Sequence, residues 1–305
     1  MKRICLSFCV VVVFVFSFAH TSYAQSKNTL QLSPAYIDVT LEKSQEEAQV
    51  SFFLTNNTQK SLSLDLFSID FQQKDDLGTI GFLGKDADNY SYALSSFLQF
   101  ENPYITIEPG EKEEVRVTIQ NRQDLTPGSH YAAVVAREAI LEADKPSVAP
   151  AISGLIYITK IGGERYNLSF KNLSFPSSFV SVFSPSTAFV TLQNDGNTYL
   201  IPYGTADVYD IFGRKIYKGI INESSVRVFP QSIRRVPVYF RSVAFELPLS
   251  LNTLKLQARD SLGKTSITYN ESYLYVNLWF FGGLIISGVA IIFILKRLKK
   301  KKTHD

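Results

Sequence analysis

Five aspartates between residues 70 and 88 are the side chains best suited to chemistry: Asp70, Asp75, Asp76, Asp86 and Asp88. Two carboxylates that face one sugar can cleave a glycosidic bond, and several together can hold Ca²⁺ through their oxygen atoms. Their spacing does not match the D-x-D-x-D-G pattern of a calcium loop. The segment around them, about 72–102, is also longer than a compact β-domain requires. We therefore predict a solvated acidic loop, with calcium binding and hydrolysis of envelope polysaccharide as the alternatives.

Three aromatic residues near the end of this segment extend the candidate site. Phe97, Phe100 and Tyr104 could form a ligand-binding face, or they could pack in a hydrophobic core, which is the commoner use of such side chains. The predicted ligand loop comprises Asp75, Asp76, Asp86, Asp88, Phe97, Phe100 and Tyr104.

Other residue types give little support for catalysis. Both cysteines, Cys5 and Cys9, lie near the N-terminus, and the only histidines after residue 24 are His130 and His304. The chain contains no G-x-S-x-G elbow, no H-E-x-x-H pair and no phosphate-binding glycine loop. We predict that His130 has a structural role, that the protein is not an enzyme, and that it uses no metal or cofactor.

The N-terminal segment has the order of a secretory signal peptide. Lys2 and Arg3 precede an apolar run from Cys9 to Phe18, and Ser22-Tyr23-Ala24 supplies small residues around a cleavage position. We predict that residues 1–24 are a signal peptide cleaved after Ala24. The mature chain then contains no thiol, which excludes disulfides and cysteine nucleophiles.

A second apolar run, Leu278 to Leu295, is uncharged and would span about 27 Å as a helix, close to the thickness of a bilayer core. Aromatic residues precede it and basic residues follow it, as is typical of a stop-transfer anchor with its basic tail in the cytoplasm. We predict a membrane helix over 276–295, a cytoplasmic tail over 296–305 and the N-terminus outside the cell. The predicted membrane-anchor residues are Trp279, Lys296, Arg297, Lys299 and Lys300.

The charge of the segment between these two ends argues against a nucleic-acid partner. The whole chain has 31 basic and 28 acidic residues. Without the eight basic residues of the two ends, and without Asp305, the remainder has a net charge of −4. A mildly acidic ectodomain does not offer the basic surface that nucleic-acid binding requires.

The segment from Gln25 to Asn277 shows the pattern of an all-β protein. Short runs rich in Val, Ile, Phe, Tyr and Thr alternate with Asn, Gly, Pro and Asp clusters, which favours a sandwich over a barrel. Strict alternation over Val115 to Ile119 predicts a strand with one buried face. Gly162-Gly163 marks a joint, so we predict two immunoglobulin-like β-sandwich domains, over 25–162 and 163–275.

The second predicted domain contains two well-marked reverse turns and eight candidate strands. Asp210 to Arg214 and Asp260 to Lys264 each couple an aspartate to a glycine that can adopt a positive φ. The predicted strands are Tyr166–Phe175, Ala188–Gln193, Thr205–Tyr209, Lys215–Ile220, Val226–Phe229, Val236–Arg241, Leu254–Arg259 and Thr265–Tyr275.

Several of these motifs together resemble those of a known family. They are Leu54-Thr55-Asn56-Asn57-Thr58, Glu108-Pro109-Gly110-Glu111, Pro127-Gly128, Asn194-Asp195-Gly196-Asn197, Asp210-Ile211-Phe212-Gly213 and the series Pro230, Ser232, Arg234. With the signal peptide, the membrane helix and the basic tail, the layout is similar to the WxL-interacting proteins of Gram-positive cell surfaces. The resemblance implies a first domain that contacts peptidoglycan and a second domain that binds another surface protein.

We therefore expect a membrane-anchored binding or scaffold protein of the cell surface. Its expected partners are the lipid bilayer and another surface protein, peptidoglycan or both. A partner could add a strand to an exposed sheet edge, which leaves no motif in the sequence. The alternatives are a membrane-tethered hydrolase that uses the acidic loop and an envelope assembly chaperone.

Overall fold

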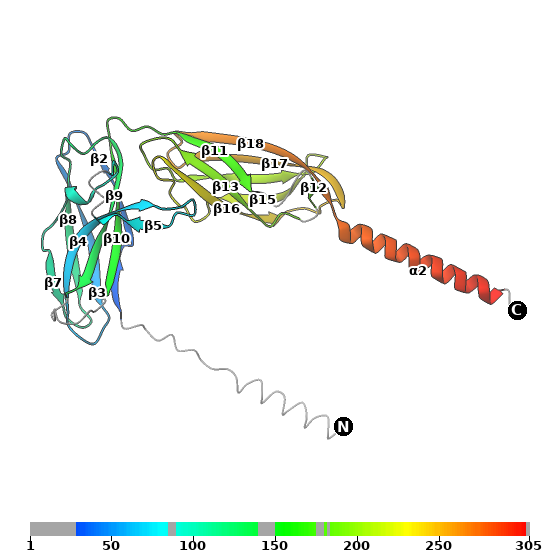
Figure 1. Cartoon of the computed structure of the whole chain (residues 1–305), viewed down its shortest axis with the longest axis horizontal. Helices are drawn as coiled ribbons and strands as arrows, with labels where there is room; N and C mark the ends of the chain where they lie inside the picture. Colours follow the sequence, from blue (N-terminus) through cyan, green and yellow to red (C-terminus); the bar gives the residue numbers. More distant parts are fainter. Residues whose placement is uncertain (1–28, 85–89, 140–149, 175–179, 182–183, 303–305) are drawn as a thin grey trace, which may run out of the picture.

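A computed structural model describes residues 29–84, 90–139, 150–174, 180–181 and 184–302. Nearly all of its elements are strands, and one long helix lies at the C-terminus (Figure 1). This confirms the all-β prediction for the segment before the helix. The predicted signal peptide, Asp86, Asp88 and His304 lie outside the described residues.

Residues 30–160, the N-lobe, form two sheets that face each other. Their strands are β1 (Leu30–Ser33), β2 (Tyr36–Leu41), β3 (Glu47–Asn56), β4 (Leu62–Gln73), β5 (Ile80–Phe82), β6 (Leu98–Phe100), β7 (Tyr104–Ile107), β8 (Lys112–Gln120), β9 (Gly128–Glu138) and β10 (Ala151–Lys160). One sheet has the order β1-β3-β8-β6 and the other the order β2-β10-β9-β4-β5, with β7 also paired to β4. All neighbouring strands in both sheets are antiparallel except β2 and β10.

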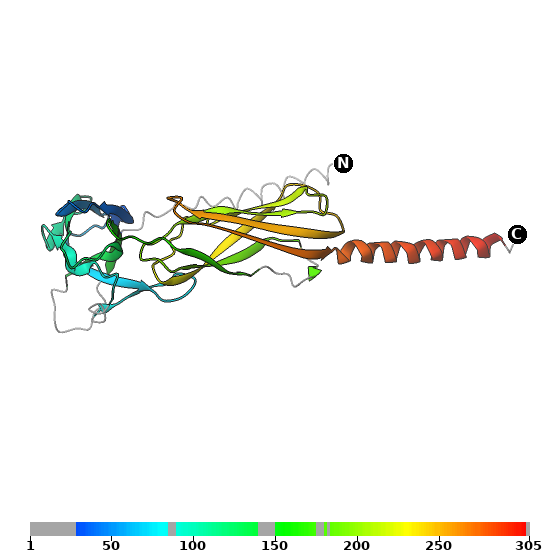
Figure 2. The same ribbon diagram turned by 90° about the horizontal axis from the view of Figure 1, so that it is seen from above.

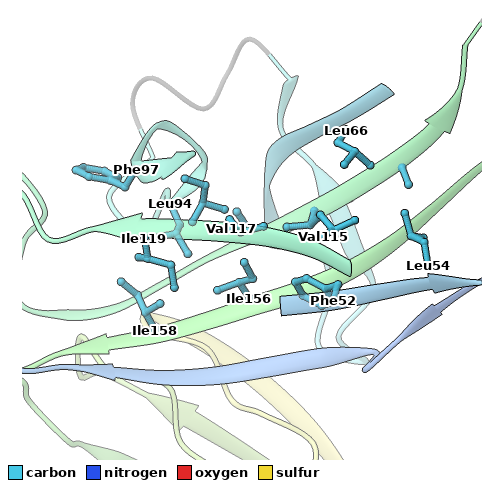
Figure 3. Close-up of a cluster of buried hydrophobic side chains, with 14 of the residues drawn as sticks. Phe52, Leu54, Leu66, Leu94, Phe97, Val115, Val117, Ile119, Ile156 and Ile158 are labelled. Carbon is cyan, nitrogen blue, oxygen red and sulfur yellow. The ribbon is translucent and has the colours of Figure 1, made fainter. Parts of the chain in front are cut away.

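The core of the N-lobe lies between these two sheets. Phe52 and Val117 from the first sheet meet Ile156 from the second, and all three are fully buried (Figure 3). The predicted alternation in β8 is confirmed, because Val115, Val117 and Ile119 are buried while Arg116 is exposed. Such alternation turns one face of the strand toward the core and the other toward water.

Residues 168–276, the C-lobe, form a single eight-stranded sheet. Its strands are β11 (Leu168–Ser174), β12 (Val180–Ser181), β13 (Thr187–Asn194), β14 (Pro202–Tyr209), β15 (Lys215–Ile221), β16 (Ser232–Ser242), β17 (Leu249–Asp260) and β18 (Ser266–Val276). The order is β11-β13-β16-β15-β14-β17-β18-β12. The sheet curls around one core, so that the Phe170 ring of β11 stacks on the Tyr269 ring of β18 at 4.3 Å.

The two reverse turns predicted in the C-lobe are both present. The Asp210 carboxylate accepts hydrogen bonds from the amides of Phe212 and Arg214, both at 2.9 Å. The Asp260 carboxylate does the same for Leu262 at 2.6 Å and for Lys264 at 2.7 Å. The backbone amides of a turn have no carbonyl acceptor on a neighbouring strand, and each aspartate carboxylate accepts their hydrogen bonds instead. Aspartate is favoured at this position for that reason.

Two segments differ from the sequence prediction. The expected loop 72–102 contains β5, β6 and a 3₁₀ turn, η2 (Ser95–Phe97), so it is largely ordered structure. The expected strand Val226–Phe229 forms only an isolated bridge between Leu200 and Val228. Arg227 and Phe229 of this segment contact the N-lobe, while Val226 packs against the C-lobe core.

The helix α2 (Leu278–Lys302) leaves the end of the C-lobe that is remote from the N-lobe (Figure 1). Its segment Leu278–Arg297 is long and apolar enough to cross a membrane. Of the predicted anchor residues, Trp279 is 87% exposed, Lys296 and Arg297 are exposed, and Lys299 and Lys300 continue the helix. The strands of the N-lobe run across the long axis of the molecule, so Figure 2 shows them end on, while those of the C-lobe run along it (Figures 1 and 2).

Burial of His130 makes the stability of the N-lobe depend on pH. His130 is 3% exposed, with Nε2 2.8 Å from the Thr126 carbonyl oxygen and Nδ1 3.1 Å from that of Ala93. Burial lowers its pKa from the ordinary 6.5, so the unfolded chain binds a proton more readily than the folded chain. The contribution of neutral, buried His130 to the free energy of unfolding is therefore fully present above pH 6.5. It is lost as the pH falls from 6.5 toward the lowered pKa of His130 in the folded chain.

We expect His130→Gln to reduce the loss of stability between pH 7.5 and pH 5.5, about one unit either side of the ordinary pKa. The measurement is the urea midpoint of the full chain in detergent at both pH values. If the urea midpoint falls by the same amount in the variant and in the natural chain, His130 is not the cause of the loss of stability in acid.

Candidate functional site at the junction of the lobes

The predicted acidic loop lies where the two lobes meet. The β4–β5 hairpin extends from the N-lobe toward the C-lobe (Figures 1 and 2). At its tip, Asp76 lies 3.4 Å from the Arg235 guanidinium, and its carbonyl oxygen accepts a hydrogen bond from the Arg235 amide at 2.6 Å. The side-chain amide of Gln73 donates to the Ile233 carbonyl oxygen, also at 2.6 Å. The hairpin therefore clamps the C-lobe.

The other aspartates of the hairpin stabilise local turns. The exposed Asp75 accepts a hydrogen bond from the Thr79 amide at 2.9 Å, and hydrogen bonding by Thr79 lowers the Asp75 pKa. Asp70 is buried, and its carboxylate accepts from the amides of Leu94 at 2.6 Å and Ser95 at 2.8 Å. Asp70 thus holds η2 in place and is not open to a substrate.

The three aromatic residues of the predicted ligand loop do not share one surface. Phe97 and Phe100 belong to the N-lobe core or pack against it, which is the core role that the sequence left open. Tyr104 is 75% exposed and pairs with Asp65 in β4. Asp65 lies about 25–30 Å along β4 from its C-terminal end. The structure therefore separates Tyr104 from the hairpin that carries Asp75 and Asp76.

An aromatic cluster forms the centre of the junction. Phe229 of the C-lobe is buried against three rings of the N-lobe: Tyr131 at 4.7 Å, Phe71 at 6.1 Å and Tyr157 at 6.1 Å between ring centroids. Aromatic rings packed in these orientations contribute to stability beyond the free energy gained by burying their apolar surface. The cluster is continuous between the lobes, as in the interior of one domain.

Arg227, two residues before Phe229, lies in a cage of tyrosines. Its guanidinium carbon is 4.2 Å from the Tyr157 ring, 4.5 Å from the Tyr36 ring and 5.4 Å from the Tyr199 ring. Its Nη2 lies 2.6 Å from the Asp38 carboxylate, and only 11% of the side chain is exposed. Cation–π contacts and a charge-assisted hydrogen bond both act on this largely shielded guanidinium, while the Asp38 side chain remains 41% exposed.

The loop Asn194–Asn197 forms a third contact. The Asn197 carbonyl oxygen accepts from the Ser129 amide at 2.8 Å, and its side-chain amide donates to the carbonyl oxygens of Pro127 and Gly163 at 3.1 and 3.0 Å. Asn194 is fully buried and shapes this loop through the Thr198 and Val228 carbonyl oxygens. The Asn-rich motif and the Pro127-Gly128 motif therefore meet in space.

Buried tyrosines supply neutral hydroxyl groups at the junction. Burial raises the pKa of Tyr157 to about 12, and it also raises the pKa of Tyr199, whose hydroxyl donates to Asp38 at 2.8 Å. These phenols remain protonated at physiological pH. They can donate hydrogen bonds, but they cannot act as nucleophiles there.

The arrangement stabilises contact between the lobes. Within the described ranges, no group of three or more His, Cys, Asp or Glu side chains could hold a metal ion. Sequence reasoning missed Arg227 and Phe229 as junction residues. Both belong to the segment Val226–Phe229, which the sequence predicted as a strand of the C-lobe.

A separate cavity of about 480 Å³ lies in the N-lobe, away from the junction. Leu30, Leu62 and Ile152 line it, and the ion pair between Lys60 and Glu138, 2.7 Å apart, lies at its rim. An apolar pocket with a few polar groups at its edge suits a small ligand group or a partner's side chain.

Comparisons with known proteins give no family. No protein-family model matches the chain, and no curated protein matches it. The solved YadV chaperone is 13% identical over 80% of this chain and 98% of its own, with a TM-score of 0.37. The class 5 fimbriae chaperone CfaA is 11% identical over 80% and 99%, with a TM-score of 0.39. The CsuC–CsuE chaperone–tip adhesion subunit complex of Acinetobacter baumannii gives 12% identity over 73% and 92%, with a TM-score of 0.37. Similarities this low establish neither a shared fold nor a shared function.

We expect Arg227→Met to loosen the junction while keeping an unbranched side chain against the tyrosines. Loss of a hydrogen-bonded charge should lower stability by about 1–3 kcal/mol. Spin labels at Glu113→Cys and Lys255→Cys, with Cys5 and Cys9 replaced by serine, would report the distance between the lobes. The variant should broaden the distance distribution.

Arg241→Met is the matched control, because Arg241 is 78% exposed and lies 3.9 Å from its partner Glu223. The control should leave the distance distribution unchanged. If Arg227→Met leaves it equally narrow, Arg227 does not fix the orientation of the lobes.

Proposed function

We propose that this chain is a single-pass membrane protein whose two lobes form a rigid arm that binds another surface protein. The observation that carries the proposal is the junction in which Phe229 and Arg227 of the C-lobe are buried against aromatic rings of the N-lobe. A scaffold that presents binding surfaces at a fixed geometry requires such a junction, because relative motion is the default for linked domains. The helix α2 supplies the anchor.

Several finer features belong to the same proposal. The lobes are immunoglobulin-like domains of a protein similar to the WxL-interacting family, with the N-terminus outside and the basic end of α2 in the cytoplasm. The C-lobe binds the partner protein, and the N-lobe contacts the cell wall. The N-lobe cavity, with Lys60 and Glu138 at its rim, is the place we assign to a wall component.

The edge of the C-lobe sheet offers a place for a partner strand. β12 pairs with β18 only at Leu274 and Tyr275, although β18 begins at Ser266. Among the described strands, none forms ladder hydrogen bonds with the outer edge of β18 between Ser266 and Ser272, although the Phe170 ring of β11 stacks on Tyr269 beside it. Unpaired strand edges are sites of strand addition by other chains.

The proposal is tested with the full chain held in lipid nanodiscs. We expect saturable retention of a protein from a cell-surface extract, competed by excess unlabelled chain, and separate retention on purified peptidoglycan. Arg227→Met should weaken any binding that contacts both lobes, with Arg241→Met as the control. Folded chain that retains neither protein nor peptidoglycan would overturn the proposed function.

A further inference from the structure

The C-lobe meets the membrane helix without a linker. β18 ends at Val276 and α2 begins at Leu278, so Asn277 is the only residue between them. The Asn277 amide donates to the Pro248 carbonyl oxygen at 2.8 Å, which ties it to the segment before β17. Its side-chain oxygen accepts from the Phe280 amide at 3.0 Å and caps the helix. The sheet therefore ends within one residue of the apolar helix.

Two loops of the C-lobe lie at this same end. Tyr209 pairs with Thr253, so the turn after β14 lies near the start of β17, and Leu249 pairs directly with Val276. Tyr217 pairs with Ser242, which brings the β16–β17 loop to the same end. The turn Asp210–Arg214 and the loop 243–248 thus lie toward the end of the C-lobe where β18 ends, from which the helix leaves (Figure 1).

Both loops expose large apolar side chains. Ile211 is 61% exposed and Phe212 is 74% exposed in the turn, while Val243 is 54% and Phe245 is 71% exposed in the loop. Leu249, 55% exposed, lies between the loop and the helix. Single exposed apolar residues are normal on protein surfaces, but a group of them at one end marks an interaction site.

We propose that these two loops insert into the lipid interface, so that the C-lobe sits directly on the bilayer. The one-residue joint at Asn277 selects lipid as the occupant, because it holds Leu249 beside the residue where the apolar helix begins. Each apolar side chain that moves from water into the bilayer raises the equilibrium constant for the inserted state of the loops by roughly tenfold or more. The inference rests on the membrane anchoring proposed for α2.

A basic residue, Arg214, lies beside the exposed Phe212 in the turn Asp210–Arg214. The Arg214 guanidinium lies 6.0 Å from the Phe212 ring centroid and is held by the Asp210 carboxylate, with Nε 2.7 Å from Oδ2. Arg214 is half exposed, so it can meet lipid headgroups while Phe212 enters the apolar layer. The carboxylate that shapes the turn is itself shielded, with none of its side chain exposed.

The chain contains a matched control at the opposite end of the same lobe. The turn Asp260–Lys264 has the same aspartate geometry, and its Leu262 is 62% exposed. β17, which joins the two ends, has 12 residues. A strand of that length spans about 40 Å, so Leu262 lies well beyond reach of the bilayer that contains α2.

The test uses the full chain, with Cys5 and Cys9 replaced by serine, in nanodiscs that contain phosphatidylglycerol and phosphatidylcholine. Single cysteines at Phe212→Cys, Phe245→Cys, Leu262→Cys and Ile286→Cys carry an environment-sensitive fluorophore, and spin-labelled lipids quench it. We expect quenching at 212 and 245 to exceed that at 262 several-fold, and quenching at 286 in the helix to be strongest.

Each pattern of quenching supports or overturns the inference. Quenching at 286 with no excess at 212 and 245 over 262 would overturn membrane seating of the loops and leave the anchor intact. Absence of quenching at 286 would overturn the anchor itself and the inference with it. A second readout uses Phe212→Ser combined with Phe245→Ser, which should reduce quenching of a label at Ile211→Cys, whereas Leu262→Ser should not.

Discussion

Burial of Phe229 among Phe71, Tyr131 and Tyr157 is the interaction on which the arrangement of the molecule depends. It removes apolar rings of both lobes from water at one place, and it shields the neighbouring Arg227, which bonds the half-exposed Asp38 at its edge. The hydrogen bonds of the Asn197 loop and the β4–β5 hairpin surround this centre. Each lobe has its own core, but the direction of one relative to the other is determined here.

Local features of the fold could be predicted from the sequence. The alternation of Val115 to Ile119 and the turns at Asp210 and Asp260 depend on neighbouring residues, and the structure contains all of them. The apolar run after residue 277 likewise identified the helix that is long enough to cross a membrane. In each case the physical cause lies within a short stretch of chain.

The junction could not be predicted in this way, because its partners are far apart in sequence. Asp38 and Arg227 are separated by 189 positions, and neither belongs to a motif that names the other. The same limit applied to Asp76, whose carboxylate was assigned to a ligand loop from composition alone. Its partner Arg235 becomes visible only when the β4–β5 hairpin is placed against the C-lobe. Phe97 was left open between a ligand face and the core for the same reason, since the residues that surround it in the N-lobe core are distant in the sequence.

The single residue between β18 and α2 has a mechanical consequence. Asn277 is bonded to the segment before β17 and to the first turn of the helix, so it cannot act as a free hinge. A change in the tilt of α2 would therefore rotate both lobes together, and the displacement would be largest at the N-lobe. In the proposed anchored arrangement, the distance of the N-lobe from the membrane would depend on the thickness and lateral tension of the bilayer.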